Sequence, residues 1–239
     1  MTIPHAPETT TPPASEADGP TGQAHAPRKP PARPSSQLAA HPWHGVSPGK
    51  DCPRLVTSYI EIVPTDAVKY ELDKETGILK VDRPQLFSSM IPSLYGFIPR
   101  TWCGDRLARR CEERTGKSGV RGDGDPLDIC VLSEKPITHS GILIEALPIG
   151  GLRMVDKGEA DDKIIAVMKG DAVYGGVQDL AELPEALRDR LRHYFLTYKQ
   201  MPAPVGSERR TIEIAEMYGR DEARLVIDLT RQDYDEAFT

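Results

Sequence analysis

The feature that most constrains this chain is a run containing three aspartates, Asp123-Gly-Asp-Pro-Leu-Asp128. Gly124 permits a sharp backbone bend, and Pro126 has a fixed φ and no N–H donor, so the chain should turn here instead of pairing. The residues that follow, 128–132, have the apolar character of a short buried strand. The sequence therefore predicts a loop that gathers three carboxylates at the mouth of a strand.

Three neighbouring carboxylates repel one another, and each is costly to bury while it is ionised. A hard divalent cation such as Mg²⁺ would offset this repulsion, because it takes oxygen ligands. For these residues alone, an acidic surface turn remains an open alternative. The spacing does not fit a Ca²⁺ loop of the EF-hand type, which needs further ligands and a bidentate Glu at its twelfth position.

The beginning of the chain differs in composition from the rest. Residues 1–40 are rich in Pro, Thr, Ala and Ser and contain no aromatic residue. Such a segment cannot bury enough apolar surface to offset its ordering entropy. We therefore expect a disordered Pro-rich tail over 1–40, followed by a single folded domain over 41–239.

Charge and cysteine content bound the partners and the compartment. The net charge of −6 argues against a general binder of nucleic acids or membrane surfaces. The four cysteines form no CxxC pair, so reduced structural thiols are expected, although pairing or metal binding by Cys103 and Cys111 stays open as a lesser alternative. No secretory signal or membrane-spanning stretch is visible. We expect a cytoplasmic protein.

Runs of β-branched and apolar residues, separated by turn residues, predict a mainly β domain. The expected strands are 55–63, 67–72, 78–83, 128–132, 142–147, 164–168 and 211–217. Residues 88–100 contain two prolines and a glycine and are expected to form a packed loop. Helices are expected over 184–200 and 221–236, with a shorter one over 107–113. This order favours an α+β fold, mainly β, with two helices flanking a small β-barrel.

Two further groups of charged residues lie beside predicted strands. Lys69 and Glu71 are two residues apart in one strand, so they project from the same face. Residues 156–163, with the sequence Asp-Lys-Gly-Glu-Ala-Asp-Asp-Lys, form a second acidic loop that leads into the strand 164–168. Taken separately, each is also consistent with a solvent-facing ion pair or a hydrophilic hairpin.

Taken together, these segments resemble the soluble family I inorganic pyrophosphatases over about residues 55–238. The central motif is Asp123-Gly-Asp-Pro-Leu-Asp128. The other matching segments, in the same order and with similar spacing, are Tyr59-Ile-Glu61-Ile, Val68-Lys69-Tyr-Glu71, Val81-Asp-Arg83, Tyr95-Gly-Phe, Asp156 with Asp161-Asp-Lys163, and Tyr198-Lys199. The resemblance implies a five-stranded, OB-like barrel that hydrolyses inorganic pyrophosphate to two orthophosphates by a metal-activated water.

The resemblance also implies roles for individual residues. Asp125 would be the catalytic base, which accepts the proton of the attacking water. The residues expected to hold several Mg²⁺ ions are Asp123, Asp128, Asp156 and Asp161, with Glu71 and Glu61 acting through waters. The residues expected to bind the phosphates are Lys69, Arg83, Tyr95, Lys163, Tyr198 and Lys199. The cations among them explain how so many carboxylates can share one cavity.

Two features depart from the family pattern. Ile91 stands where many members have a tyrosine, so one outer hydroxyl contact is lost or replaced. An insertion at about 102–120 is basic and longer than in compact bacterial members, and it is expected to form either a flap beside the site or an added oligomer contact. Because family members are often hexamers or dimers, we expect a homo-oligomer and leave the number of subunits open.

Two other functions stay open at this point. One is a metal-dependent hydrolase of other phosphoanhydrides, such as short polyphosphate; the lack of an aromatic base-stacking motif argues against nucleotides. The other is an inactive barrel that acts as an interaction module through its Pro-rich tail. The complete set of acids and lysines argues against this second reading.

Overall fold

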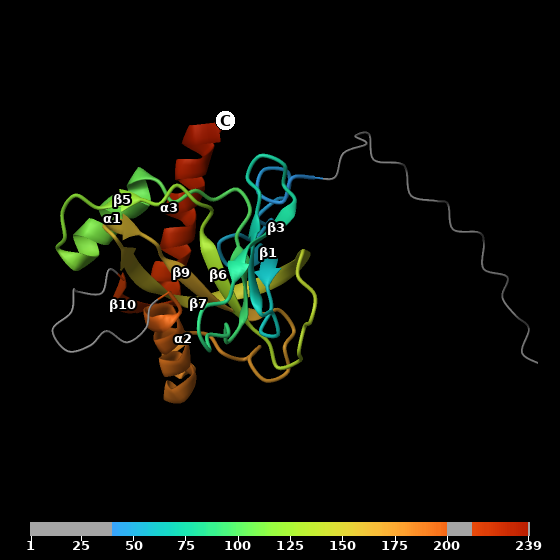
Figure 1. Ribbon diagram of the computed structural model, residues 1–239. Coiled ribbons are helices and arrows are strands. Elements are labelled where there is room, and N and C mark those ends of the chain that lie inside the picture. The colour runs from blue at the N-terminus through green and yellow to red at the C-terminus, as the bar shows by residue number, and fades with distance from the viewer. Residues whose placement is uncertain (1–39, 200–211, 239) are drawn as a thin grey trace, which may run out of the picture. The chain divides into compact units, whose positions relative to one another are not determined.

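Five strands close into a ring in the computed structural model, which describes residues 40–199 and 212–238 (Figure 1). The strands of the ring are β1 (Val56–Ile62), β4 (Leu94–Phe97), β6 (Asp128–Leu132), β7 (Ile142–Asp156) and β9 (Lys163–Met168). β1 pairs with β4, β4 with β6, β6 with β9, β9 with β7, and β7 pairs back with β1. The predicted mainly β fold with a five-stranded, OB-like barrel is confirmed. Nearly all of the tail predicted over 1–40 lies outside the described residues.

Among the strands of the ring, β4 is the one that the sequence did not predict. Residues 88–100 were expected to form a packed loop, and this is wrong for Leu94–Phe97, which form a fully buried strand between β1 and β6. A Cβ atom on Gly96 would lie 1.8 Å from the carbonyl oxygen of Tyr59, so a glycine is needed for β4 to approach β1 this closely. The prolines that argued against regular structure, Pro92 and Pro99, lie just outside the strand.

One strand is longer than predicted. The expected strand 142–147 continues without a break to Asp156 as β7, which has 15 residues. Its first part pairs with β1 and its later part with β9, while its outer edge pairs with β10 (Ile212–Gly219). Two short strands, β5 (Arg121–Gly122) and β8 (Glu159–Ala160), extend this sheet at its end. β7 therefore links the ring to the C-terminal part of the chain.

The barrel strands are apolar on both faces, and the alternation of their side chains divides the core in two. On β6, Ile129 belongs to a cluster that continues into helices α1 and α3, whereas Cys130 belongs to a cluster that continues into α2. Ile164 and Ile165 of β9 divide in the same way. The continuous apolar runs in the sequence thus reflect strands buried on both sides.

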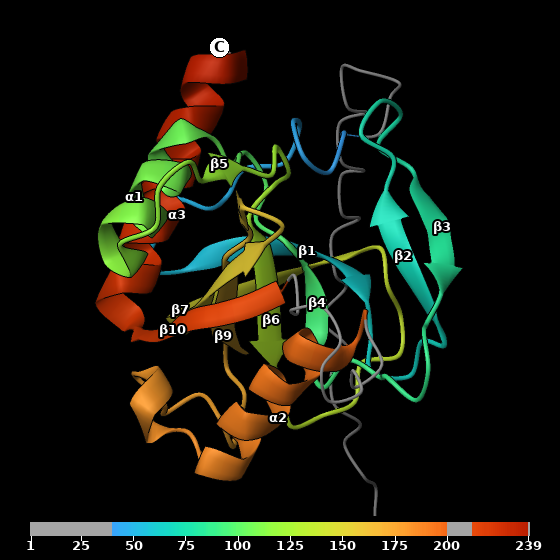
Figure 2. The same ribbon diagram turned by 60° about the vertical axis from the view of Figure 1, so that its left-hand side comes forward.

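The helices cover two parts of the barrel. They are α1 (Asp105–Thr115), α2 (Glu185–Thr197) and α3 (Arg220–Phe238), with a short 3₁₀ turn η1 (Leu180–Glu182) before α2. The two predicted helices near the end of the chain and the shorter one over 107–113 are confirmed. Figure 2 shows α1 beside α3, on the side of the barrel opposite to a separate hairpin. No helix in the described ranges has both the length and the apolar character needed to cross a bilayer.

The separate hairpin consists of β2 (Val68–Leu72) and β3 (Leu79–Pro84), both as predicted, and forms its own two-stranded sheet next to β1 (Figure 2). β3 is half-exposed or exposed along its length. The hairpin is therefore the least buried part of the β structure that contributes to the site described next.

The four cysteines carry free thiols, and three of them are buried in the core: Cys103, Cys111 and Cys130.

Candidate active site

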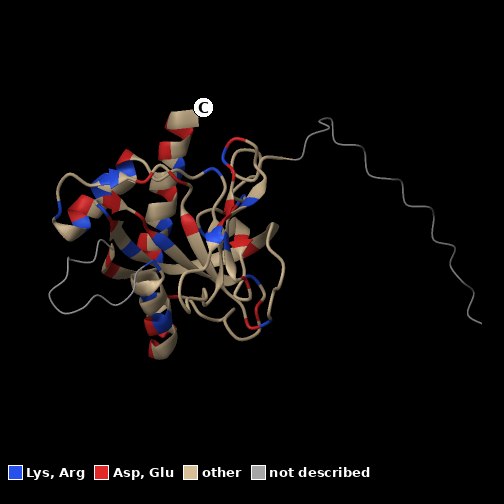
Figure 3. Cartoon of the chain, viewed as in Figure 1, with Lys and Arg blue, Asp and Glu red and all other residues tan. Residues whose placement is uncertain are grey.

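Two adjoining cavities lie where the hairpin faces the barrel. All thirteen predicted site residues line one or both of them. Glu61 and Glu71 line the side cavity; Lys69, Tyr95, Asp125 and Asp128 line both; Arg83, Asp123, Asp156, Asp161, Lys163, Tyr198 and Lys199 line the main cavity. Figure 3 shows acidic and basic residues interleaved in this middle part of the domain. The structure therefore brings together side chains that are up to 138 residues apart in the sequence, from Glu61 to Lys199.

The loop with three aspartates is held in shape by backbone hydrogen bonds. Gly124 has a φ of 75°, which favours glycine, and the Asp125 N–H donates to Asp123 Oδ1 at 2.9 Å. The Cys103 N–H donates to the Asp125 carbonyl at 2.8 Å, and the Gly124 N–H donates to the Cys103 carbonyl at 3.1 Å. The chain just before α1 therefore fixes the loop that carries the aspartates.

The most buried cation that lines the cavities lies where β6 and β9 begin side by side. Asp128 is the register partner of Lys163 in this parallel pair. The Lys163 ammonium forms ion pairs with Asp128 Oδ2 and Asp161 Oδ1, and the Tyr95 hydroxyl donates to Asp128 Oδ2 at 2.6 Å. Burial lowers the pKa of Lys163, but the two carboxylates outweigh burial and hold this pKa well above its usual range. Lys163 therefore stays charged although only 2% of it is exposed.

Burial raises the pKa of several carboxyl groups in and beside the site, Asp128 among them. Burial raises the pKa of Asp123 to about 8, and the negative charge of Asp161 adds to this effect. Burial also raises the pKa of Glu61 to about 8; the Leu72 N–H, which donates to Glu61 Oε1 at 2.7 Å, only partly offsets it. Both shifts arise mainly from burial, which the nearby hydrogen bonds and positive charges do not fully offset.

The remaining cations come from the hairpin and from the residues after α2. Lys69 Nζ lies 2.8 Å from Glu71 Oε2, so these two side chains share one face of the hairpin as predicted, and Lys69 Nζ also lies 3.0 Å from Asp82 Oδ2. Beyond the end of α2, Lys199 Nζ lies 2.8 Å from Asp156 Oδ2. Each lysine thus pairs with an acid that lines or borders the cavity.

Oxygen donors of this kind fit hard divalent cations. Asp156 Oδ1 is buried and has no hydrogen-bond partner among the described residues, so this oxygen is available as a ligand. Within residues 40–199 and 212–238, no three His, Cys, Asp or Glu side chains already surround one point as a metal cage. Lys163 forms ion pairs with Asp128 and Asp161. The residues therefore fit divalent cations by their chemistry, with Lys163 as the competing cation.

Two charged residues that line the cavities, and one that pairs with lining residues, were not predicted from the sequence. Lys74, in the hairpin loop, forms an ion pair with Asp125 Oδ1 and lines the side cavity. Asp82 bridges Lys69 and Arg83, and Glu159 lines the main cavity. Asp82 had a usable signal, because it lies in the returning strand next to Arg83, the register partner of Lys69. No pattern in the sequence singled out Lys74.

The two departures from the family pattern have defined places. Ile91 is buried in the apolar cluster that contains Tyr95 and Phe195. None of the residues that line the two cavities comes from the insertion 102–120, whose helix α1 packs against α3. Cys103, at the start of the insertion, forms the backbone hydrogen bonds that hold the aspartate loop.

A closed barrel that gathers carboxylates, lysines and an arginine around one cavity defines a class of protein, a metal-dependent hydrolase of small and highly charged phosphoanhydrides. Comparison with known proteins identifies the family. A family profile described as "Inorganic pyrophosphatase" matches residues 58–235. The chain is 52% identical over 196 residues to an inorganic pyrophosphatase of Chlamydia trachomatis, covering 82% of this chain and 94% of that protein.

Two further comparisons agree. The chain is 38% identical over 189 residues to soluble inorganic pyrophosphatase 2 of Chlamydomonas reinhardtii, covering 79% of this chain and 85% of that protein. The crystal structure of inorganic pyrophosphatase from Thermus thermophilus superposes with a TM-score of 0.67 at 28% identity, covering 82% of this chain and 99% of that one. The chain belongs to the inorganic pyrophosphatase family. It hydrolyses inorganic pyrophosphate to two orthophosphates and uses a divalent metal cofactor.

Proposed function

We propose that the cofactor is Mg²⁺, with several ions per site, and that Asp125 is the general base of pyrophosphate hydrolysis. The observation that carries the second part is exposure. The Asp125 side chain is 44% exposed, whereas those of Asp128, Asp156 and Asp161 are 23%, 15% and 13% exposed. A base must reach the attacking water, while cation ligands are best held rigidly. This difference supports a role for Asp125 as the base and for the less exposed aspartates as cation ligands.

Asp123, Asp128, Asp156 and Asp161 would hold the cations directly, and Glu61 and Glu71 would hold further ions through water. When bound, the cations would reduce the charge of pyrophosphate and lower the pKa of a bound water from about 16 toward about 7. Asp125 would then accept the proton as the water attacks. Support for direct ligation comes from the burial of these acids and from the unpartnered Oδ1 of Asp156.

The cationic residues would bind the two phosphate groups. Arg83 can contact two phosphate oxygens at once, whereas a lysine provides a single point charge. Lys69, Lys163 and Lys199 surround the main cavity from three different elements, and Tyr95 and Tyr198 add hydroxyl donors. Fixed donors of this kind stabilise the charge on the departing phosphate, and each is worth about 3–4 kcal/mol in comparable sites.

The test is phosphate release from pyrophosphate by the wild type, by Asp125→Asn and by a matched control, Asp51→Asn. Asp51 is exposed and lines neither cavity, so its amide variant controls for a general change of charge. We expect release by the wild type and the control only with Mg²⁺, and a loss of about 100-fold or more in Asp125→Asn. Full activity in Asp125→Asn would move the base to another acid, and equal activity in chelator would exclude Mg²⁺.

We also propose that the protein assembles as a homo-oligomer through the hairpin and the segment after it. In the described residues, five of the nine large apolar side chains that are exposed lie in this one stretch: Ile78, Val81, Leu86, Phe87 and Met90. Light scattering after gel filtration should give a multiple of the 26.3 kDa chain mass. Val81→Lys with Phe87→Lys should reduce it, and Val173→Lys, at another exposed apolar residue, should not. A monomeric wild type would contradict this.

A cytoplasmic location is proposed on the basis of the thiols. The four cysteines are free, as is usual where cellular reductants keep thiols reduced. Cell fractionation followed by the pyrophosphate assay tests this directly, since the activity should remain with the cytosolic fraction.

A further inference from the structure

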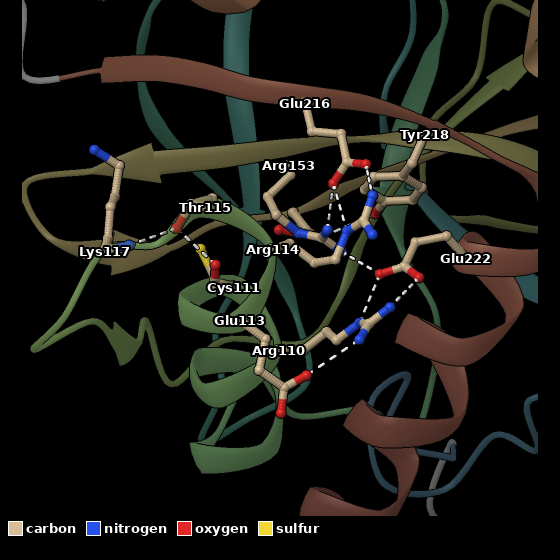
Figure 4. Close-up of polar contacts among 11 residues, drawn as sticks. Arg110, Cys111, Glu113, Arg114, Thr115, Lys117, Arg153, Glu216, Tyr218 and Glu222 are labelled. Carbon is tan, nitrogen blue, oxygen red and sulfur yellow. Dashed lines mark hydrogen bonds and ion pairs between the residues drawn. The ribbon is translucent and has the colours of Figure 1, made fainter.

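A buried arginine lies behind the site and takes no part in the cavities. Arg153, on β7, has no exposed surface. Its Nη1 lies 2.6 Å from Glu216 Oε2 and its Nη2 lies 2.6 Å from Glu222 Oε1 (Figure 4). The guanidinium also lies over the ring of Tyr218, 4.8 Å from the centroid. Burying a charge is costly, so a wholly buried guanidinium needs several fixed partners, and here it has them.

The same two glutamates also bind the inserted helix. Arg110 of α1 forms a bidentate pair with Glu222, with distances of 2.9 Å from Nε and 2.7 Å from Nη2 (Figure 4). Arg114, one turn further along α1, forms an ion pair with Glu216. Each glutamate is therefore shared between Arg153 and an arginine of the insertion. Figure 3 shows both signs of charge on α1 and on the neighbouring α3.

The network reaches the site through Asp162. This residue is 1% exposed; its Oδ2 accepts a hydrogen bond from the Tyr218 hydroxyl at 2.9 Å and lies 3.6 Å from Arg153 Nε. Its two neighbours in the chain, Asp161 and Lys163, line the main cavity. Successive side chains of extended backbone point to opposite sides, so Asp162 holds this segment from behind while its neighbours face the cavity.

We propose that Arg153 and Asp162, with Tyr218 between them, are positioning residues for pyrophosphate hydrolysis, and that the inserted helix α1 stabilises them through Arg110 and Arg114. The insertion thus acts on the site from behind the barrel wall instead of covering the cavity. This inference rests on the roles proposed above for Asp161 and Lys163. A site that depends on fixed oxygens loses activity when its supporting residues shift by a fraction of an ångström.

The test uses variants that keep the core packed. Tyr218→Phe removes only the hydroxyl that donates to Asp162, and Asp162→Asn keeps the shape of the side chain. Arg110→Ala with Arg114→Ala removes the contribution of α1 at partly exposed residues. The matched control is Arg106→Ala, because Arg106 also joins α1 to α3, through Asp233 and Glu236, but has no contact with Arg153 or Asp162.

Four quantities are measured: kcat, KM for pyrophosphate, the Kd for Mg²⁺ from calorimetry, and Tm. We expect kcat about 10-fold lower and a Kd for Mg²⁺ about 3- to 10-fold weaker in Tyr218→Phe and Asp162→Asn. The Arg110/Arg114 double variant should change both by about 2- to 5-fold, and the lysine versions of these two substitutions should restore part of the loss. Arg106→Ala should match the others in Tm but keep the wild-type kcat and Kd.

The inference is overturned if Tyr218→Phe and Asp162→Asn keep the wild-type kcat and Mg²⁺ affinity, or if Arg106→Ala loses as much as they do. The second result would mean that any weakening of the α1–α3 contact lowers activity through stability alone. The result is separable from the proposed function, because the wild type and Asp125→Asn decide that question in the same assay. Wild-type release that is lost in Asp125→Asn leaves the function in place whatever the positioning variants do.

Discussion

Two of the regions that supply cations to this active site differ in how firmly they hold them. In the barrel wall, Lys163 is buried and forms contacts with two carboxylates at the start of β6 and β9. In the hairpin, the side chains of Lys69 and Arg83 are 25% and 33% exposed and both pair with Asp82, while Lys69 also pairs with Glu71. Both regions face the same cavity. The charge of the wall is therefore part of the folded core, and the charge of the hairpin is not.

This difference separates stability from activity. A buried charge whose partner is removed is left unneutralised and destabilises the fold, whereas an exposed pair contributes little because water and salt screen it. Substitutions in the wall should therefore change both stability and activity. Substitutions in the hairpin should change activity with almost no change in stability.

The largest effect is expected for Lys163→Met. It leaves Asp128 and Asp161 unpaired in a buried place, so the free energy of unfolding in chelator should fall by about 3–5 kcal/mol. Phosphate release should fall by at least about 100-fold, because a fixed phosphate-binding cation is lost as well. Urea denaturation in chelator and the phosphate assay measure the two effects.

Lys80→Met is the matched control, since Lys80 forms an exposed ion pair with Asp73 on the hairpin. Its urea midpoint should equal that of the wild type. An unchanged midpoint for Lys163→Met would show that the charge of the wall contributes nothing to the fold, and the contrast between the two regions would fail.

A smaller effect is expected for Glu222, behind the wall. Burial raises its pKa, but the hydrogen bonds from Arg110 and Arg153 outweigh burial and lower the pKa from 4.5 to about 2. Because the folded state holds this carboxyl less protonated than the unfolded state does, the stabilisation is complete above about pH 4.5 and is lost as the pH falls toward 2. Partial solvent screening limits it to about 1–2 kcal/mol.

Urea denaturation of the wild type and of Glu222→Gln at pH 5 and pH 3 measures this contribution. The difference in unfolding free energy between the two proteins should shrink at the lower pH. Asp73→Asn on the hairpin is the control. The pKa of Asp73 is also lowered, through a hydrogen bond from Lys80. Its side chain is 31% exposed, against 16% for Glu222, so solvent screens this pair more and the variant should follow the wild type at both pH values. A constant difference for Glu222→Gln argues against the assigned pKa.

A hairpin substitution should have the opposite profile. Arg83→Lys keeps the charge but removes the planar group that contacts two phosphate oxygens, so kcat/KM should fall by about 10-fold. The free energy of unfolding should stay within about 0.5 kcal/mol of the wild-type value, since the pair with Asp82 is partly exposed. Steady-state kinetics test the expected loss of kcat/KM, and urea denaturation tests the unchanged stability. A loss of stability as large as that of Lys163→Met would show that Arg83, like Lys163, is part of the folded core.

The sequence predicted the strands of the barrel wall, but it did not predict which strands pair or which of their side chains come into contact. β6 and β9 were predicted from their apolar runs, and the acidic loops at their starts were recognised. That Asp128 and Lys163 face each other depends on the parallel pairing of these two strands, which no local pattern specifies. β4 was missed for a related reason: Gly96 matters through its closeness to Tyr59, 37 residues away in the chain. The site as a set came from the resemblance to a family.

Charged residues whose partners are distant were the least predictable. Arg153 lies within an apolar run of β7, and its partners Glu216 and Glu222 come from β10 and α3, more than 60 residues later. Lys74 is exposed, unlike Arg153, but its partner was equally hard to predict. It lies in a hairpin loop, where lysines are common, and its pairing with Asp125 depends on how the hairpin packs against the barrel. Neither arrangement leaves a periodic pattern in the sequence.

The smallest effect is expected for Lys74→Ala, which removes the hairpin cation that contacts the proposed base. Both side chains of this pair are 44% exposed, so the ammonium orients the Asp125 carboxylate only weakly. We expect kcat/KM to fall by about 2- to 3-fold at low ionic strength, and we expect this difference from the wild type to disappear near 1 M salt, where charges more than about 3 Å apart are screened. Stability should not change. Lys74→Arg, which keeps the charge, should behave as the wild type. A loss above 10-fold that persists in high salt would show that Lys74 is held as firmly as Lys163, and the hairpin would then share the fixed character of the wall.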